Sequence, residues 1–128
     1  MSELKFTKEH EWIKIINEGA VAAIIGITDF AQEQLGDIVS IEIPKRGSSF
    51  KRMQAMAIVD SVKASSDIYA PISGEVIEAN ENLIEKPEII NQSPYDLGWI
   101  VKIKPLDMKE LESLMTKEEY DRYVGEIK

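Results

Sequence analysis

Hydrophobic residues, many of them β-branched, recur along the chain in short runs separated by turn-forming glycines and prolines. Runs of this length between turn residues are typical of β-strands. They are EWIKII (11–16), AVAAIIGI (20–27), DIVSIEI (37–43), AMAIVDSV (55–62), DIYAPI (67–72), EVIEA (75–79) and WIVKIKP (99–105). Within DIVSIEI, alternation predicts that Val39, Ile41 and Ile43 share one face of a strand. The pattern therefore predicts a mainly β core.

Two segments depart from the strand pattern and favour helix. In TDFAQEQLG, Asp29 and Gln32 have the spacing of a capping box, and Gly36 can adopt the left-handed conformation that closes a helix. The second segment covers residues 107–128. It contains two further capping-box pairs and a helical stripe of apolar residues that favours core packing: Asp107 with Glu110, Thr116 with Glu119, and Leu111, Leu114, Met115, Tyr120, Tyr123 and Val124. We expect two helical pieces here, packed outside the β core.

Length and composition predict one compact domain over residues 1–128. The chain has 128 residues and 44% hydrophobic content, which is enough for one core. Its longest apolar run, residues 20–27, is much shorter than the roughly 20 residues of a membrane-spanning helix. The first residues, MSELKFTKEHEW, lack the apolar region of a signal peptide. We therefore expect a soluble, unprocessed protein in the cytoplasm that does not act at a membrane.

Charge and residue types exclude several functions. A net charge of −8 repels nucleic acid and anionic lipid. There is no cysteine, and a single histidine cannot anchor a typical zinc site. The glycine spacing matches neither the dinucleotide fingerprint nor the phosphate loop, and no G-x-S-x-G occurs. The sequence therefore predicts no catalytic residue and no metal ligand set.

The only histidine, His10, lies between Glu9 and Glu11 in KEHEW. Such a trio can bind a proton or a small cation. The alternative is structural: a solvated strand start whose Trp12 packs inward, and this interpretation is favoured.

Lys63 lies in VDSVKASSD, and the nearest basic residues are Arg52 and Lys86. A lysine at a turn is usually only a solvated residue. A Schiff-base lysine needs burial or nearby cations, whereas Asp60 and Asp67 are anionic. Two predicted strands meet around Lys63, so a tight turn would direct its side chain away from the protein. That arrangement suits a lysine that another enzyme acylates.

These segments together resemble the H proteins of the glycine cleavage system, which are free-standing lipoyl carriers. The resemblance covers nearly the whole chain through FTKEHEWIKI, GITDFAQEQLGDIVSIEIP, VDSVKASSDIYAPISGEVIEAN and INQSPYDLGWIVKIKP, in the family's order. Lipoyl domains of 2-oxoacid dehydrogenases share only the acid-x-x-lysine-alanine hairpin. Biotin carriers usually flank their lysine with methionines, whereas Val62 and Ala64 flank it here. The fold implied is a lipoyl-domain-like sandwich-barrel, a barrel-sandwich hybrid with a short internal helix and C-terminal helices.

The resemblance implies that lipoate is linked covalently to Lys63 and that the protein is a carrier, not an enzyme. The implied partners are a pyridoxal-phosphate glycine decarboxylase that loads an aminomethyl group, a tetrahydrofolate-dependent aminomethyltransferase that receives it, and dihydrolipoyl dehydrogenase, which reoxidises the dithiol. A lipoate ligase or a lipoyl/octanoyl transferase would attach the cofactor.

Further roles follow from the resemblance alone. In the family the lipoyl-lysine arm, when it carries the aminomethyl group, folds back into a surface cleft. The positions here that match the acidic residues of that cleft are Glu11 and Asp67, with His10 as a weaker candidate. We expect this site to be wet, so that either carboxylate contributes about 1 kcal/mol or less. Asp60 stands where the family commonly has glutamate, and this shorter side chain would affect recognition by the attaching enzyme.

Two alternatives stay open. The protein could instead act as a lipoyl relay that donates lipoate to other enzymes through an amidotransferase, using the same Lys63. It could also be an interaction domain without a cofactor, in which case the lysine of protein from the native host would be unmodified.

Overall fold

A computed structural model describes residues 4–17 and 19–127, which form two antiparallel sheets. The six-stranded sheet has the order β1 (Leu4–Phe6), β2 (Glu11–Asn17), β3 (Val21–Ile27), β9 (Val101–Pro105), β8 (Gly74–Ala79) and β5 (Ser49–Phe50). The three-stranded sheet has the order β4 (Ile38–Glu42), β6 (Ala55–Ser61) and β7 (Ser65–Tyr69). The predicted mainly β fold is confirmed.

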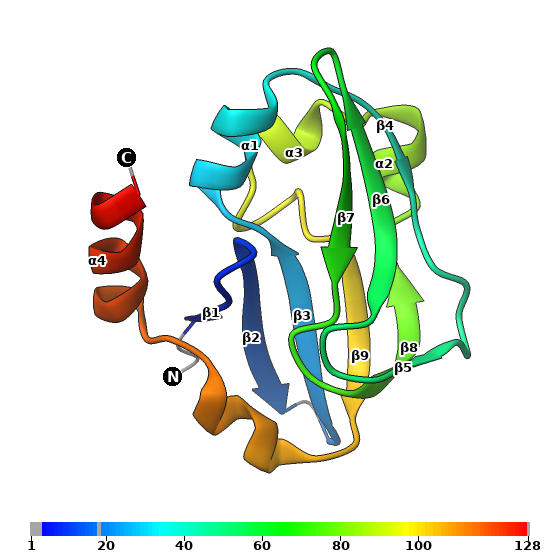
Figure 1. Cartoon of the computed structure of the whole chain (residues 1–128). Coiled ribbons are helices and arrows are strands. Elements are labelled where there is room, and N and C mark those ends of the chain that lie inside the picture. Colours follow the sequence, from blue (N-terminus) through cyan, green and yellow to red (C-terminus); the bar gives the residue numbers. More distant parts are fainter. Residues whose placement is uncertain (1–3, 18, 128) are drawn as a thin grey trace.

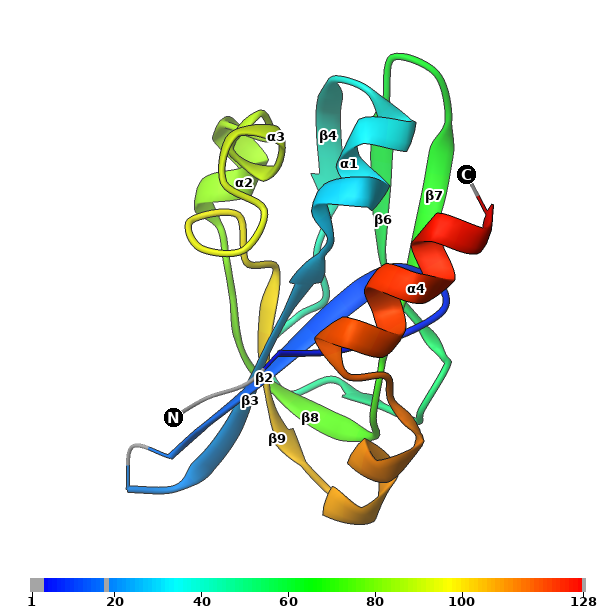
Figure 2. The same ribbon diagram turned by 90° about the vertical axis from the view of Figure 1, so that its left-hand side faces the viewer.

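Helices cover one end and one side of the two sheets (Figure 1). Helices α1 (Asp29–Leu35) and α3 (Ile89–Gln92) lie side by side at the end that carries the β6–β7 hairpin, and α2 (Asn82–Glu85) lies near β4. After β9 the chain forms a 3₁₀ helix, η1 (Met108–Ser113), and then α4 (Lys117–Ile127), which packs beside β1 (Figure 2). Helical structure after β9 agrees with the prediction. None of the described helices is long and apolar enough to cross a membrane.

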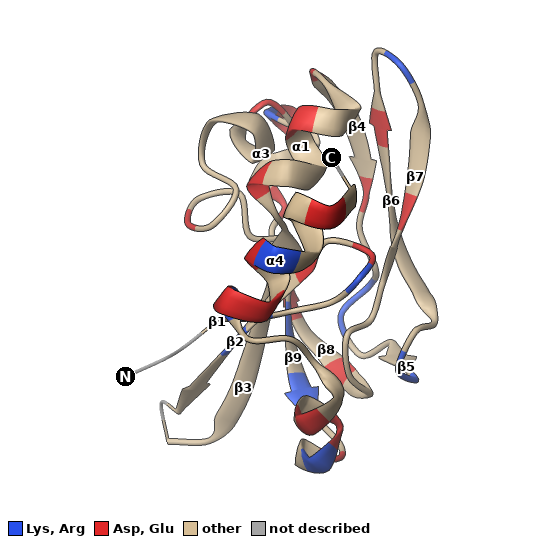
Figure 3. Cartoon of the chain, turned by 60° about the vertical axis from the view of Figure 1, so that its left-hand side comes forward, with Lys and Arg blue, Asp and Glu red and all other residues tan. Residues whose placement is uncertain are grey.

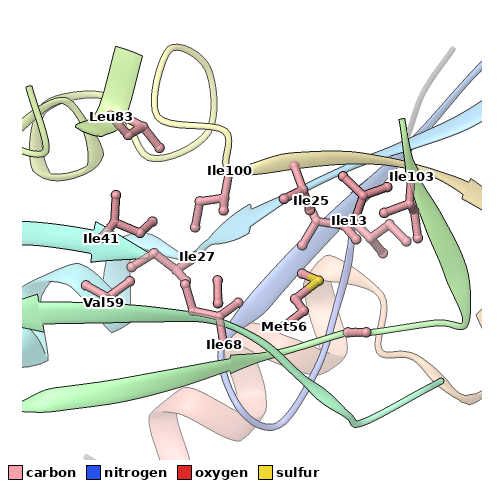
Figure 4. Packing of buried hydrophobic residues seen from close by; sticks show 14 of the residues in the cluster. Ile13, Ile25, Ile27, Ile41, Met56, Val59, Ile68, Leu83, Ile100 and Ile103 are labelled. Carbon is pink, nitrogen blue, oxygen red and sulfur yellow. The ribbon is translucent and has the colours of Figure 1, made fainter. Parts of the chain in front are cut away.

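The main core lies between the two sheets and receives side chains from both (Figure 4). Ile13, Ile25 and Ile103 come from the larger sheet, whereas Val59 and Ile68 come from the smaller one, and all five are buried. Because each sheet buries one face, the arrangement is a sandwich rather than a closed barrel. The hairpin that carries Lys63 is thus anchored by the buried side chains of β6 and β7.

The prediction that Val39 shares one face of β4 with Ile41 and Ile43 is wrong, because Val39 is 54% exposed. The pairing of β4 with β6 shifts between Ile38 and Ser40, where one extra residue enters the strand. Such a bulge changes which face the following residues occupy. As a result Ile38 and Ile41 are buried, and Val39 faces solvent near the lysine hairpin.

The caps agree with the sequence in part. Thr28, not Asp29, caps α1 by accepting from the Ala31 amide, and Gly36 has the expected positive φ of 77° with a ψ of −156°. At α4 the Thr116 hydroxyl accepts from the Glu119 amide while the Glu119 carboxylate accepts from the Thr116 amide, so this capping box is confirmed.

The capping box predicted at η1 forms only by half. Asp107 accepts from the Lys109 amide, but Glu110 instead accepts from the amide and hydroxyl of Ser73. Glu110 therefore ties η1 to the turn before β8.

The predicted apolar stripe of residues 107–128 packs as expected but divides between two clusters. Leu111 and Leu114 pack on the main core. A second cluster, built on Phe6, Trp12 and Tyr120, receives Met115, Tyr123 and Val124. The rings of Phe6 and Tyr120 stack with their centroids 4.6 Å apart. This second cluster fixes α4 against the start of the larger sheet.

The hydroxyl of Tyr120 should contribute strongly to stability. It lies 2.7 Å from Thr28 Oγ1 and 2.8 Å from His10 Nδ1, and Tyr120 is buried. We expect Tyr120→Phe to lower the free energy of unfolding by about 1–3 kcal/mol, because two polar groups lose a partner. Urea denaturation measures this change.

Tyr123→Phe is the matched control, since the Tyr123 hydroxyl is exposed and lies 3.4 Å from the Lys8 carbonyl oxygen. Its effect should stay within about 0.5 kcal/mol. If both variants lost the same free energy of unfolding, the hydrogen bonds that join the Tyr120 hydroxyl to Thr28 and His10 would not be the source of the stabilisation.

Candidate functional site

Lys63 lies in the loop that joins β6 to β7, at the end of a hairpin that projects past α1 and α3 (Figure 1). Val62, Lys63 and Ala64 are all exposed. In Figure 3 the tip of this hairpin is basic and the strands below it carry acidic positions. The structure therefore places Lys63 where another protein can reach its amine.

The hydroxyl of Ser61 holds the backbone of the tip. It accepts hydrogen bonds from the amides of Lys63 and Ala64, both at 3.1 Å, and donates to the Ala64 carbonyl oxygen, also at 3.1 Å. The Ser61 amide donates to the same carbonyl oxygen at 2.8 Å. Ser61 was not predicted as a functional residue from the sequence, although a serine just before a tight turn commonly bonds the backbone ahead of it. Several hydrogen bonds thus hold the backbone of the tip, whereas the Lys63 side chain is exposed.

A second contact ties the tip to the segment between α1 and β4. The Val62 amide donates to the Asp37 carbonyl oxygen at 3.0 Å. A Cβ atom on Gly36 would lie 3.5 Å from Lys63 Cε and 3.6 Å from Val62 Cγ2. The aliphatic stem of Lys63 therefore passes over Gly36 before its amine reaches solvent.

Asp60 bridges the strands on either side of β6. Its carboxylate accepts from Ser65 Oγ at 2.6 Å and from Ser40 Oγ at 3.0 Å. These two hydrogen bonds, with the Ser65 bond the larger cause, hold the pKa of Asp60 below its usual value. The carboxylate is consequently ionised and fixed in position beside the tip.

Glu11 is buried at the start of β2, with 1% of its surface exposed. Its carboxylate accepts from Thr7 Oγ1 at 2.6 Å and from the Tyr69 amide at 3.1 Å. Burial disfavours the charged form and raises the pKa of Glu11 to about 7, although the two hydrogen bonds oppose this shift. The expectation of a solvated carboxylate is thus wrong for Glu11, because the Thr7 segment and β7 enclose it.

Asp67 is exposed on β7, four residues beyond Lys63 and two before Tyr69. At about 3.3 Å per residue, Asp67 lies roughly 13 Å along the chain from Lys63. Because Tyr69 donates to Glu11, the buried carboxylate meets the same strand just beyond Asp67. Lys63 in the hairpin loop, Asp67 on β7 and the Tyr69 amide that contacts Glu11 thus follow one another along one stretch of chain.

His10 is half-buried and faces helices rather than β7. Its Nδ1 bonds the Tyr120 hydroxyl, and its ring centroid lies 4.7 Å from that of Phe30 on α1. Burial lowers the pKa of His10, with a smaller opposing effect from Glu9. His10 therefore links the β1–β2 turn to α1 and α4. Trp12 packs inward as the structural interpretation of KEHEW predicted, but the strand start is not solvated, since Glu11 is buried.

Comparisons with known proteins show the family to which the chain belongs. The family described as glycine cleavage H-protein matches residues 4–127. A glycine cleavage system H protein from Halothermothrix orenii is 52% identical over 97% of this chain and 94% of its own length. Another from Coprothermobacter proteolyticus is 48% identical over 96% of this chain and 95% of its own length.

Among solved structures, a glycine cleavage system H protein from Mycobacterium marinum superposes with a TM-score of 0.85. It is 34% identical, and the match covers 96% of this chain and 97% of that one. Full-length similarity in both sequence and structure shows that this chain belongs to the glycine cleavage H-protein family, whose members are carrier proteins rather than catalysts.

Proposed function

We propose that this protein is the lipoyl carrier of a glycine cleavage system, with lipoate joined to Lys63 through an amide bond. The observation that carries the proposal is the exposed lysine at a hairpin tip whose backbone Ser61 holds in place. A backbone held in this way presents the amine to the attaching enzyme in one geometry, while the side chain stays free to swing. Membership of the H-protein family supplies the biochemical context.

In this role the arm would visit three enzymes in turn. A pyridoxal-phosphate decarboxylase would load an aminomethyl group, a tetrahydrofolate-dependent aminomethyltransferase would remove it, and dihydrolipoyl dehydrogenase would reoxidise the dithiol. The protein itself contributes no bond chemistry. Tethering raises the effective concentration of the arm at each docked enzyme, which makes each transfer quasi-intramolecular.

We propose further that Asp60 takes part in recognition by the lipoate ligase or lipoyl/octanoyl transferase. Its carboxylate is held beside the tip by Ser40 and Ser65. A carboxylate fixed three residues before the lysine gives the attaching enzyme a charged group of defined position to recognise.

Between visits, the loaded arm would lie back along β7, so that its ammonium group meets Asp67 and then reaches Glu11 once an opening beside β7 exposes that carboxylate, which is 1% exposed in the free protein. A buried carboxylate gives a stronger charge-assisted contact than an exposed one, because water competes less for either partner. A bound ammonium would in turn favour the ionised form of Glu11, whose pKa is about 7 in the free protein. We therefore assign Glu11 the larger share of the stabilisation.

The experiment that tests this proposal follows the lifetime of the loaded arm. Glu11→Gln should shorten it by about tenfold, which corresponds to the loss of one charge-assisted hydrogen bond. Asp67→Asn should shorten it by about fivefold at most, since Asp67 is exposed. Protein loaded from glycine by the decarboxylase, then quenched and measured by mass spectrometry, gives both values.

Glu75→Gln is the control, because Glu75 is an exposed acid on β8 and lies outside the path along β7. It should load normally and keep the wild-type lifetime. Equal lifetimes in wild type and both test variants would show that Glu11 and Asp67 do not hold the arm.

A further inference from the structure

Thr7 is a buried residue in the turn before β2, and its side chain meets the carboxylate of Glu11. Its hydroxyl oxygen lies 2.6 Å from Glu11 Oε1, the shorter of the two hydrogen bonds to that carboxylate. Both residues are nearly inaccessible, with 5% of Thr7 and 1% of Glu11 exposed. A polar pair at this depth is held by its own contacts rather than by water.

The direction of the Thr7–Glu11 hydrogen bond follows from what else the hydroxyl does. Its oxygen accepts from the backbone amides of Glu9 and Glu11, both at 3.2 Å. A hydroxyl has two acceptor lone pairs and one proton, so the proton of Thr7 is left for Glu11 Oε1. Thr7 can therefore act on this carboxylate only as a donor, and it favours the ionised form.

The other oxygen of Glu11 is held from the opposite side. The Tyr69 amide of β7 donates to Oε2. The charged neighbour that acts on Glu11 is Glu9, from the same turn as Thr7, and it opposes ionisation. One side-chain donor and one backbone donor thus fix the plane of the carboxylate between the turn and β7, and of these two only Thr7 can be removed by substitution.

We propose that Thr7 is a positioning residue, which orients the Glu11 carboxylate to receive the ammonium group of the loaded arm. The inference rests on the proposed function, since it assigns Thr7 a part in holding that arm. Thr7 need not touch the arm itself. It acts through Glu11, so its effect must vanish when the Glu11 carboxylate is absent.

The first test uses the protein without lipoate and does not depend on the carrier role. Carbon-13 NMR follows the titration of the Glu11 carboxyl group. Thr7→Val should move its midpoint upward by about one to two pH units, because the ionised form loses a charge-assisted donor. Thr7→Ser, which restores the hydroxyl, should titrate as wild type.

Thr116→Val is the matched control, because it removes a threonine hydroxyl that accepts from a backbone amide at the start of α4. It should leave the Glu11 midpoint in place. An unchanged midpoint in Thr7→Val, or a shifted one in Thr7→Ser, would overturn the proposal, the second because the methyl group and not the hydroxyl would then be responsible.

The second test measures the lifetime of the aminomethyl-loaded arm in a double-mutant cycle. Thr7→Val should shorten the lifetime several-fold, yet add nothing when Glu11→Gln is already present, since residues that act as a unit are not additive. Multiplicative losses would overturn the positioning role. A wild-type protein that cannot be loaded at Lys63 would overturn the proposed function and the docking role with it, while the titration would still report whether Thr7 orients Glu11.

Discussion

Lys63→Arg should abolish lipoylation completely, the largest effect we expect from any single change in this protein. Arginine keeps the positive charge and nearly the same reach, but its guanidinium group is not an acylatable amine at neutral pH. The tip should keep its shape, because the Ser61 hydroxyl bonds the backbone amides of residues 63 and 64 and not the lysine side chain. Intact mass after incubation with lipoate ligase, lipoate and ATP should show one lipoyl amide on wild type and none on the variant.

Lys45→Arg provides the matched control, because Lys45 is an exposed lysine outside the hairpin. It should accept one lipoyl group as wild type does. Lipoylation of the Lys63→Arg protein at some other lysine would contradict the assignment of Lys63 as the attachment site. The hairpin geometry accounts for attachment only at Lys63.

Local sequence was enough to predict the parts of the site that local contacts build. Two β-rich runs separated by Val62, Lys63 and Ala64 predicted the hairpin, and the structure has β6 and β7 at those positions. Thr116 and Glu119 predicted the start of α4 because a capping box joins residues only three apart. Short elements such as β5 and α3, with two and four residues, were missed because they are too brief to show a period.

The environment of Glu11 could not be predicted in the same way, since it depends on contacts distant in sequence. Glu11 and Tyr69 are 58 residues apart, and His10 and Tyr120 are 110 apart. Nothing in KEHEW indicates that β7 closes over one carboxylate or that α4 covers the histidine. The sequence therefore indicated candidate residues while leaving their burial, and hence the strength of their interactions, undetermined.

Val39 shows a different limit, because the alternation that predicts a strand face assumes a regular strand. The bulge between Ile38 and Ser40 breaks that assumption, and no glycine or proline within β4 indicates it. The outcome is an exposed valine on the strand next to the lysine hairpin, where sequence alternation places a core residue.

The burial of Glu11 makes its contribution to stability depend on pH, and the sign follows from its raised pKa. Below its ordinary value of 4.5, Glu11 is protonated in both the folded and the unfolded protein, and it adds no penalty. Between 4.5 and about 7 the unfolded chain loses this proton more readily than the folded one, so stability falls as pH rises. Above about 7 both states are ionised and the loss is complete.

We therefore expect Glu11→Gln to gain stability relative to wild type as pH rises through this window. The shift of about 2.5 pH units corresponds to about 3 kcal/mol between the two ends of the range. Urea denaturation of both proteins from about pH 4 to about pH 8 measures it, at pH values that bracket the two ends of the titration. Groups with lowered pKa, such as Asp60 and Glu119, act in the opposite direction but are common to both proteins and cancel in the difference.

Glu75→Gln supplies the comparison, since it replaces an exposed acid on β8 and removes no buried carboxylate. A pH-independent difference between Glu11→Gln and wild type would mean that the hydrogen bonds from Thr7 and Tyr69 fully offset the cost of burying the charge. Glu11 would then ionise near its ordinary value of 4.5 in both states, and docking of the arm's ammonium would not depend on pH near 7. A difference that grows as pH rises, as we expect, would instead make the loaded arm's stability sensitive to pH in that range, because the same proton that leaves Glu11 is the one a bound ammonium displaces.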